Sequence, residues 1–254
     1  DKFLVIFGGS GKLGQQFSKT LRNNSAKVYV LDIKKRINEK DISFLKCDVQ
    51  KKNNINNAIA KIIKKEKKID TVIYNIYSKP KNYYKNFQDY DLNTWKKVID
   101  SNLTGAFLVS QIAIKNFLKR KIHGNIIFLS STYGVVGPDP SIYQGLNFKK
   151  NIYGGKFALN TPAAYSSTKT GLIGLAKYIA TNFGKNNIRA NVLSPGGVYD
   201  KQETKFVNKY KNNVPLNKMA DWTDYNGAIL FLASDASKYM TGSNLIIDGG
   251  WTAW

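Results

Sequence analysis

The chain alternates between short apolar runs and longer segments in which apolar residues recur every three or four positions. The runs have the length of strands buried on both faces, and the periodic segments have the spacing of amphipathic helices. The pattern predicts strands over residues 3–7, 27–31, 42–47, 70–74, 124–129, 188–193 and 245–247. It predicts helices over residues 15–21, 54–65, 92–98, 102–118, 163–184 and 224–233.

This order of elements predicts the fold class. Strands separated by helices of roughly 10 to 20 residues form a parallel sheet, because each connection must cross over to the same end. We expect an α/β protein with a single Rossmann domain over residues 1–254. Its doubly wound parallel sheet would have about seven strands, with helices on both faces. The 254 residues are 43% hydrophobic, enough for one sizeable core, and no repeat or linker divides them.

A glycine-rich turn joins the first expected strand to the first expected helix. It reads Gly8-Gly9-Ser10-Gly11-Lys12-Leu13-Gly14. Glycine lets the backbone turn sharply and approach a pyrophosphate, and the free N–H groups of a helix N-terminus stabilise the negative charge. The spacing Gly9-x-Gly11-x-x-Gly14 fits a dinucleotide-binding loop, and an ordinary glycine-rich loop is the alternative.

An acidic residue ends the second expected strand. Asp32 lies about 20 residues past the loop, where a carboxylate can accept both hydroxyls of an adenosine ribose and repel a 2′-phosphate. This favours NAD as the cofactor. Lys34, Lys35 and Arg36 follow at once and can hold a 2′-phosphate, so NADP stays possible.

A candidate acid–base pair lies at the start of the helix expected over 163–184. Tyr165 and Lys169 are four residues apart and therefore share one face of that helix. An ammonium close to a phenol favours the phenolate and lowers the pKa of the phenol from about 10. The phenol can then exchange a proton with a substrate oxygen near neutral pH. Chance also produces this spacing in a chain rich in Tyr and Lys, so the pair gains meaning only from the other motifs.

Two stretches do not fit the strand and helix pattern. Residues 135–162 contain prolines, glycines and several aromatic residues, and a long loop inside a compact domain is usually functional or disordered. The aromatic residues argue against disorder, so we interpret this insertion as a substrate-side loop or lid. Residues from about 199 to 215 are polar and rich in lysine, and we interpret them as a mobile flap.

Composition narrows the chemistry. A single cysteine, Cys47, excludes an internal disulfide and a cysteine metal cluster, and a single histidine, His123, argues against a zinc enzyme or a Ser-His triad. No apolar run approaches the roughly 18 to 20 residues of a membrane span, and no signal-peptide pattern opens the sequence. We therefore expect a metal-free cytoplasmic protein that does not bind a membrane.

The formal net charge of +22 has two interpretations. It can reflect an anionic partner, such as nucleic acid or phosphorylated small substrates. It can also reflect biased composition, because the lysines are scattered along expected loops and polar helix faces. We favour the second interpretation, with anionic small substrates as the main alternative, and we expect no nucleic-acid partner.

The loop, the acidic strand end and the Tyr-Lys pair occur in an order that resembles the short-chain dehydrogenase/reductase family along essentially the whole chain. The resemblance implies an NAD(P)-dependent oxidoreductase that acts on CH–OH groups with a Ser-Tyr-Lys mechanism. Tyr165 would exchange the proton, and Lys169 would lower its pKa and hold the nicotinamide ribose. Ser131, rather than its neighbour Ser130, would bind the substrate oxygen. Asn102 would hold a water that links Lys169 to solvent.

The resemblance also implies the cofactor contacts. They are Gly8, Ser10, Lys12, Leu13, Gly14, Asp32, Asp48, Val49, Asn75, Tyr165, Lys169, Pro195, Gly196 and Val198. This chain departs from the family pattern at two places near these contacts. Phe7 and Lys12 stand where the family loop has threonine and its middle glycine, and Ile76 and Tyr77 replace small residues beside the cofactor.

Ser131 and Tyr165 are 34 residues apart, a longer gap than in most of the family. In this gap and in its loop the chain resembles a bacterial subgroup associated with flagellin modification. That likeness implies a sugar or sugar-nucleotide precursor of surface glycans as substrate. The alternatives are a reductase of 3-oxoacyl thioesters or other keto substrates, and a non-catalytic NAD-binding regulatory protein. The family also implies a homodimer or homotetramer, with the helices at 102–118 and 163–184 and the last strand at the interfaces.

Overall fold

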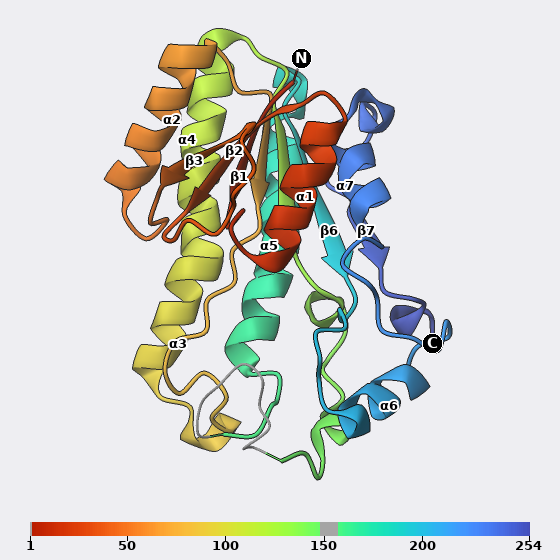
Figure 1. Ribbon diagram of the computed structural model, residues 1–254. Coiled ribbons are helices and arrows are strands. Elements are labelled where there is room, and N and C mark those ends of the chain that lie inside the picture. Colours follow the sequence, from red (N-terminus) through yellow and green to blue (C-terminus); the bar gives the residue numbers. More distant parts are fainter. Residues whose placement is uncertain (1, 148–156) are drawn as a thin grey trace.

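A seven-stranded sheet forms the centre of the molecule in the computed structural model, which describes residues 2–147 and 157–254 (Figure 1). The strand order is β3-β2-β1-β4-β5-β6-β7, and every neighbouring pair is parallel. The strands are β1 (Phe3–Phe7), β2 (Lys27–Asp32), β3 (Ile42–Lys46), β4 (Thr71–Tyr74), β5 (Asn125–Leu129), β6 (Arg189–Pro195) and β7 (Asn244–Ile247). The doubly wound parallel sheet expected from the sequence is confirmed.

The apolar runs are continuous because both faces of the sheet are covered. In β1, Val5 and Phe7 pack into one core cluster, whereas Leu4 and Ile6 pack into the other. Side chains alternate between the faces of a strand, so a strand between two helix layers needs apolar residues at every position.

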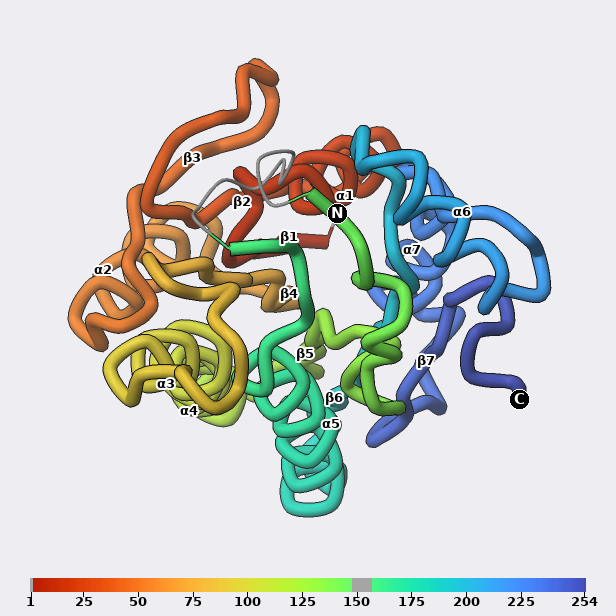
Figure 2. Tube along the Cα trace, turned by 90° about the horizontal axis from the view of Figure 1, so that it is seen from below, coloured from red at the N-terminus to blue at the C-terminus, as the bar shows by residue number. Residues whose placement is uncertain are grey.

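The helices divide between the two faces, as Figure 2 shows from the edge at which the strands end. The helices α2, α4 and α5 cover one face and share its core, and α1 and α7 cover the other. Two further helices, α3 and α6, lie beyond the carboxyl ends of the strands (Figure 1). The bounds are α1 (Lys12–Asn23), α2 (Lys52–Glu66), α3 (Leu92–Ile99), α4 (Gly105–Arg120), α5 (Ala163–Phe183), α6 (Thr204–Asn212) and α7 (Asn226–Ala233).

Two elements differ from the sequence-based expectation. The helices expected over 92–98 and 102–118 are continuous, because a π-helical turn at Asp100–Thr104 joins α3 to α4. A π turn inserts a residue and shifts the apolar periodicity, which hides the continuity in the sequence. The second difference is α6, which lies within the segment expected to be a flap. It buries Phe206 and Tyr210, which are four residues apart as in a helix. Two buried aromatic residues among lysines and asparagines are too few to show a helical pattern in the sequence.

The strand order places an opening at the carboxyl end of β1. This strand pairs with β2 on one side and β4 on the other, and such a reversal of strand order leaves a crevice above the sheet. The backbone N–H of Gly8 donates to Leu31 O at 2.8 Å, and that of Asn75 donates to Phe7 O at 2.9 Å. These bonds hold the first residues after β1 and β4 at the rim of the crevice.

The insertion expected over 135–162 packs against the C-terminal part of the chain. Ile142 is fully buried in a cluster with Phe206, Tyr210 and Trp251, and Leu159 packs against the same cluster. Residues 148–156 of the expected loop lie outside the described residues. The structure therefore locates the two ends of the insertion and leaves its role as a lid a prediction.

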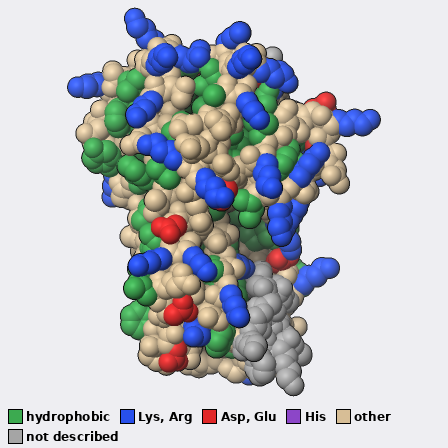
Figure 3. All heavy atoms as spheres, turned by 90° about the vertical axis from the view of Figure 1, so that its left-hand side faces the viewer, with side chains coloured by type: hydrophobic (Ala, Val, Ile, Leu, Met, Phe, Trp, Pro, Cys, Tyr) green, Lys and Arg blue, Asp and Glu red, His purple; other side chains and the backbone are tan. Residues whose placement is uncertain are grey.

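The surface carries the positive charge in dispersed form on the face seen in Figure 3. Lysine and arginine side chains lie singly over that face, with a few acidic side chains between them. None of the helices in the described ranges is long and apolar enough to cross a membrane.

Candidate active site

A cavity of about 970 Å³ opens at the carboxyl edge of the sheet. Six of the seven strands contribute to its wall through the residues at or just after their ends. From β1 to β6 these residues include Gly8, Asp32, Asp48, Asn75, Ser130 and Gly196. The parallel arrangement thus gathers distant parts of the sequence around one opening.

The glycine loop forms a tight cradle at one end of this cavity. Gly8 has a φ of +78°, and a Cβ there would lie 2.6 Å from the carbonyl oxygen of Asn75. The Asn75 side chain donates from Nδ2 to Gly8 O at 3.0 Å. On the helix side, a Cβ at Gly14 would collide with Gly8 O and lie 2.6 Å from Gly9 Cα. Only glycine lets α1 and β4 approach the loop this closely.

The cradle has the properties of a dinucleotide site. The N-cap residue of α1 is Gly11, which has no side chain to accept from the first N–H groups of the helix, and residues 11–13 line the cavity. The buried Ser10 Oγ has no hydrogen-bond partner among the described residues. An uncapped helix N-terminus beside an unsatisfied buried hydroxyl suits the oxygens of a pyrophosphate.

Asp32 and Asp48 lie in the same cavity beside the cradle. The Asp32 carboxylate accepts from Ser10 N at 3.1 Å and from Lys34 N at 3.4 Å. Asp48 accepts from Gln50 N at 3.1 Å, and Val49 next to it is buried. These backbone bonds orient both carboxylates, and Lys34 and Arg36 also line this end of the cavity.

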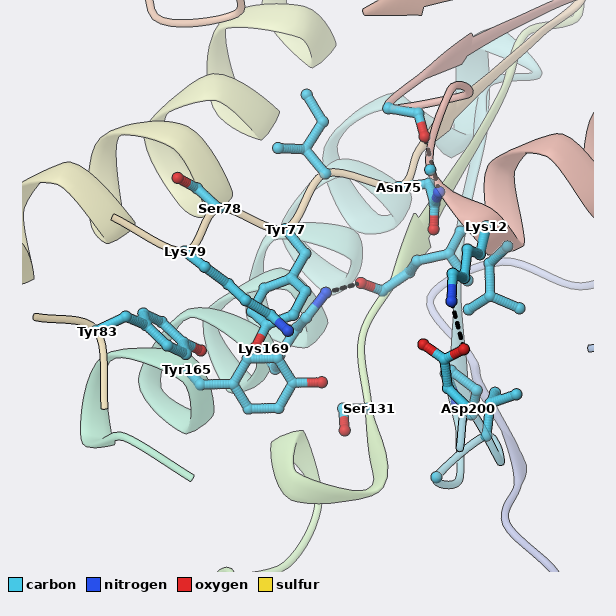
Figure 4. A pocket seen from close by; sticks show the side chains of 18 of the residues that line it. Lys12, Asn75, Tyr77, Ser78, Lys79, Tyr83, Ser131, Tyr165, Lys169 and Asp200 are labelled. Carbon is cyan, nitrogen blue, oxygen red and sulfur yellow. Dashed lines mark hydrogen bonds and ion pairs between the residues drawn. The ribbon is translucent and has the colours of Figure 1, made fainter. Parts of the chain in front are cut away.

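At the other end, Ser131, Tyr165 and Lys169 come together. Figure 4 shows the Tyr165 hydroxyl directed toward Ser131, with Lys169 behind the tyrosine. The Lys169 ammonium lies 5.7 Å from the centre of the Tyr165 ring and donates to Leu129 O at 2.6 Å. Tyr165 and Lys169 lie in the first turns of α5, and Ser131 follows β5.

The turn after β5 is fastened to α5, which sets the position of Ser131. Ser130 Oγ donates to the carbonyl of Lys169 at 2.8 Å, and Thr170 Oγ1 donates to Gly134 O at 3.0 Å. A Cβ at Gly134 would lie 2.9 Å from the carbonyl carbon of Lys169. Ser130 therefore bonds the helix backbone, whereas the Oγ of Ser131 accepts from Tyr133 N at 3.2 Å and points into the cavity.

Because Lys169 is buried, we expect the free energy of unfolding to depend on pH. Desolvation lowers the pKa of Lys169 from 10.5 to about 8. Below that pH the folded and unfolded states both hold the proton, and the cost of burying the ammonium is fully present. Between about pH 8 and 10.5 the unfolded chain holds the extra proton, so this group's contribution to the free energy of unfolding rises with pH.

We expect Lys169→Met to gain most stability relative to wild type at neutral pH. Its advantage should shrink by about 3 kcal/mol as the pH rises to 10.5. Urea unfolding of both proteins at a series of pH values measures the difference, in which the titration of all other groups cancels. A difference that stays constant with pH contradicts the burial argument.

Two of the predicted site residues do not line the cavity. Gly14 lies behind the loop, where it allows α1 to approach. Asn102 is fully buried in the π turn; its Oδ1 accepts from Ser78 N at 3.1 Å and its Nδ2 donates to Thr168 Oγ1 at 3.4 Å. Asn102 thus ties the segment after β4 to α5. All the other predicted catalytic and cofactor residues line the cavity.

Sequence reasoning missed several residues that line the catalytic end. Lys79 and Tyr83 follow β4 and face the cavity, and Tyr77, noted only as bulky, packs its ring 5.1 Å from that of Tyr165 at 63°. Their position within ten residues of a strand's carboxyl end was the available signal. Asp200, after β6, also lines the cavity.

Lys12, where the family loop has a glycine, joins two walls of the cavity. Its ammonium is ion-paired with Asp200 and lies 5.5 Å from the centre of the Trp222 ring. The loop after β1 is thereby connected to the segment after β6. The departure from the family pattern therefore leaves the loop intact and adds a contact across the mouth of the cofactor end.

Comparison with known proteins finds matches over nearly the whole chain. The sequence profile described as short chain dehydrogenase matches residues 2–143, and the profile described as enoyl-(acyl carrier protein) reductase matches residues 149–252. A post-translational flagellin modification protein A of Campylobacter coli is 30% identical over 99% of this chain and 98% of its own length. An NADH-dependent L-xylulose reductase of Ambrosiozyma monospora is 28% identical over 82% of this chain and 72% of its own length.

A solved structure is similar over nearly the same extent. It is a short chain dehydrogenase from Leptospira borgpetersenii with bound NAD+, 30% identical to this chain. The two superpose with a TM-score of 0.88, covering 99% of this chain and 93% of the other.

Proposed function

The chain belongs to the short-chain dehydrogenase/reductase family of NAD(P)-dependent oxidoreductases, and on that premise we propose a reaction and a mechanism for it. It transfers a hydride between a nicotinamide and a carbonyl or alcohol carbon, with Ser131, Tyr165 and Lys169 as its catalytic residues. The observation that carries the proposal is the meeting of these three side chains in the cavity that the glycine loop also lines.

The fit of the cavity supports NAD as the cofactor. The loop from Gly8 to Gly14 holds the pyrophosphate, Asp32 the adenosine ribose, and Asp48 with Val49 the adenine. At the catalytic end Asn75, Tyr165, Lys169, Pro195, Gly196 and Val198 surround the nicotinamide riboside. A bound nicotinamide supplies or accepts the hydride. Asp32 repels a 2′-phosphate, whereas Lys34 and Arg36 nearby keep NADP as a second choice.

The protein's own groups handle the proton and the charge. Tyr165 gives its phenolic proton to the substrate oxygen in reduction, or takes it in oxidation. The Lys169 ammonium stabilises the phenolate by its positive charge. Ser131 donates a hydrogen bond to the same substrate oxygen as negative charge develops on it. We assign to Asn102 the binding of a water on the path from Lys169 to solvent, since it bonds Thr168 directly beside that lysine.

For the substrate we propose a sugar or sugar-nucleotide precursor of surface glycans. The full-length similarity to a flagellin modification protein supports this class, and so does the similarity to a reductase of a ketopentose. The second candidate is a 3-oxoacyl thioester. It is favoured by the match of residues 149–252 to the enoyl-(acyl carrier protein) reductase profile.

The same proposal covers the organisation of the chain. Residues 1–254 form one NAD(P)-binding unit, with the insertion at about 135–162 and the segment at about 199–215 on the substrate side. Both segments line the cavity, through residues such as Tyr143, Thr161 and Asp200.

We propose a homodimer or homotetramer that pairs through α4 and α5, since Phe107 on α4 exposes 48% of its surface.

A turnover screen tests the proposed function. The protein is assayed with NADH and with NADPH against free keto sugars, nucleotide-linked keto sugars and 3-oxoacyl thioesters. We expect oxidation of NADH by a sugar substrate at least about tenfold faster than by a thioester, because tenfold corresponds to only about 1.4 kcal/mol of discrimination. Faster turnover of the thioester favours the second candidate, and no turnover with any carbonyl compound contradicts the enzyme proposal.

A further inference from the structure

The segment after β4 builds a wall of the cavity that the proposed mechanism does not use. Tyr77, Lys79, Tyr83 and Tyr84 all line the cavity, and the ring of Tyr77 packs beside that of Tyr165. The segment is held in place at Ser78, whose N–H donates to Asn102 Oδ1 at 3.1 Å. It brings an ammonium and several phenols to the catalytic end of the site, where a substrate must lie.

Two aromatic rings hold the Lys79 ammonium at this position. Its Nζ lies 4.9 Å from the centre of the Tyr77 ring and 5.8 Å from that of Tyr84, both within the range of a cation–π interaction. The Tyr77 ring in turn packs 5.8 Å from Tyr83 and 5.1 Å from Tyr165. In the view of Figure 4 the Lys79 side chain runs along the Tyr77 ring toward the ring of the proposed acid–base residue.

The Lys79 ammonium lines the cavity, where an anionic group of a substrate can reach it. The Lys79 side chain is exposed to the cavity, and partial desolvation by the surrounding residues lowers its pKa to about 8, so most molecules carry the charge at neutral pH. Asp200 opposes that shift and Lys12 adds to it. The Asp200 carboxylate is itself ion-paired with Lys12. An ammonium that faces a substrate cavity can form charge-assisted hydrogen bonds with carboxylate or phosphate oxygens.

A second donor lies next to it. The Tyr83 side chain is 2% exposed, and its hydroxyl interacts with that of Tyr77. Figure 4 shows that hydroxyl directed toward Tyr77 and Tyr165. A phenol is both a donor and an acceptor, so the O–H of Tyr83 can donate to an acceptor on the substrate.

We propose that Lys79, assisted by Tyr83, binds an acidic group of the substrate, so that the enzyme prefers carbonyl or alcohol compounds carrying a carboxylate or phosphate. The inference rests on the proposed function, because that function places the reacting carbon beside Tyr165. Lys79 is then a specificity-determining residue, and the acidic group lies a few bonds from the carbon that reacts.

The test compares sugars that differ in one group. Galactose, galacturonate and galactose 6-phosphate are oxidised with NAD+ by wild type and by Lys79→Met, Lys79→Arg and Lys81→Met. Lys81 belongs to the same segment but does not line the cavity, so Lys81→Met removes the same charge outside the site. The two acidic sugars separate recognition of a carboxylate from recognition of a phosphate.

We expect wild type to favour at least one acidic sugar over galactose in kcat/KM. In Lys79→Met that ratio should fall by about ten- to a hundredfold, mainly through KM, as for a lost hydrogen bond to a charged group. Lys79→Arg should retain much of the preference, and Lys81→Met should retain all of it. An unchanged ratio in Lys79→Met overturns the inference.

A binding measurement separates this inference from the proposed function. Calorimetry with galacturonate and galactose 6-phosphate, on each protein saturated with NADH, needs no turnover. Weaker binding by Lys79→Met in a protein that turns over no sugar supports the anion site and contradicts the proposed reaction. Equal affinity of wild type and Lys79→Met for both acids, including no measurable binding of either, overturns the anion site whether or not neutral sugars react.

Discussion

Replacing Tyr165 by phenylalanine is expected to lower kcat by about a hundred- to ten-thousandfold, the usual contribution of a general acid or base. The change removes one oxygen and leaves the ring, which packs against Tyr77 at 5.1 Å. The pocket therefore keeps its shape, and the dissociation constant of NADH should change by less than about threefold, under 1 kcal/mol. Initial rates on the best substrate of the screen and fluorescence titration with NADH measure the two quantities.

A matched control is available on the same helix. Tyr178 lies on α5 with 62% of its surface exposed and does not line the cavity. Tyr178→Phe makes the same chemical change outside the site and should leave kcat at the wild-type value. Substantial turnover by Tyr165→Phe would refute the role proposed for its phenol, and loss of NADH binding would assign the residue to cofactor binding instead.

The fold could be predicted from the sequence because each strand and helix has its own pattern of apolar residues. The strands between the two edge strands are buried at almost every position, as in the apolar run Phe3–Phe7, and each crossover helix has an apolar stripe of its own. These patterns fixed the α/β class and the parallel sheet. The sequence did not predict the π turn at Asp100–Thr104 or helix α6, because one shifts the period and the other has few apolar positions.

Those cavity residues that directly follow a strand could be predicted from the sequence, because the strand order determines where they lie. Residues that follow parallel strands meet at one edge, so Gly8, Asp32, Asn75 and Ser131 could be grouped from the sequence alone. Contacts between side chains from distant segments carry no such signal. The pairing of Lys12 with Asp200 spans 188 positions and depends on how the segment after β6 folds back.

Lys79 is a second residue whose position in the cavity could not be predicted from the sequence. In the sequence it is one lysine in a chain with a net charge of +22, and composition gives no reason to separate it from the others. Its place between Tyr77 and Tyr84 is what distinguishes it. In a strongly basic chain a cation proposed to bind substrate cannot be told from the other lysines by sequence, and only its contacts in the structure distinguish it.

The cofactor cradle should depend most sharply on Gly14. In an exposed helix Gly→Ala stabilises by about 1 kcal/mol, but here the new Cβ would collide with Gly8 O and lie 2.6 Å from Gly9 Cα. Both are backbone atoms that cannot turn aside, so α1 and the loop must separate. We expect Gly14→Ala to destabilise the protein by roughly 1–3 kcal/mol, as overpacking does.

The same separation should weaken NADH binding at least about tenfold, because it moves the helix N–H groups away from the loop that faces the pyrophosphate. Gly11→Ala in the same loop is the control for stability. Gly11 has a φ of −70°, and its Cβ would lie 3.5 Å from Gly8 O, an ordinary contact. Urea unfolding and NADH titration of both variants measure the two effects. Wild-type stability and NADH affinity in Gly14→Ala would mean that the close packing of α1 on the loop does not form the cradle.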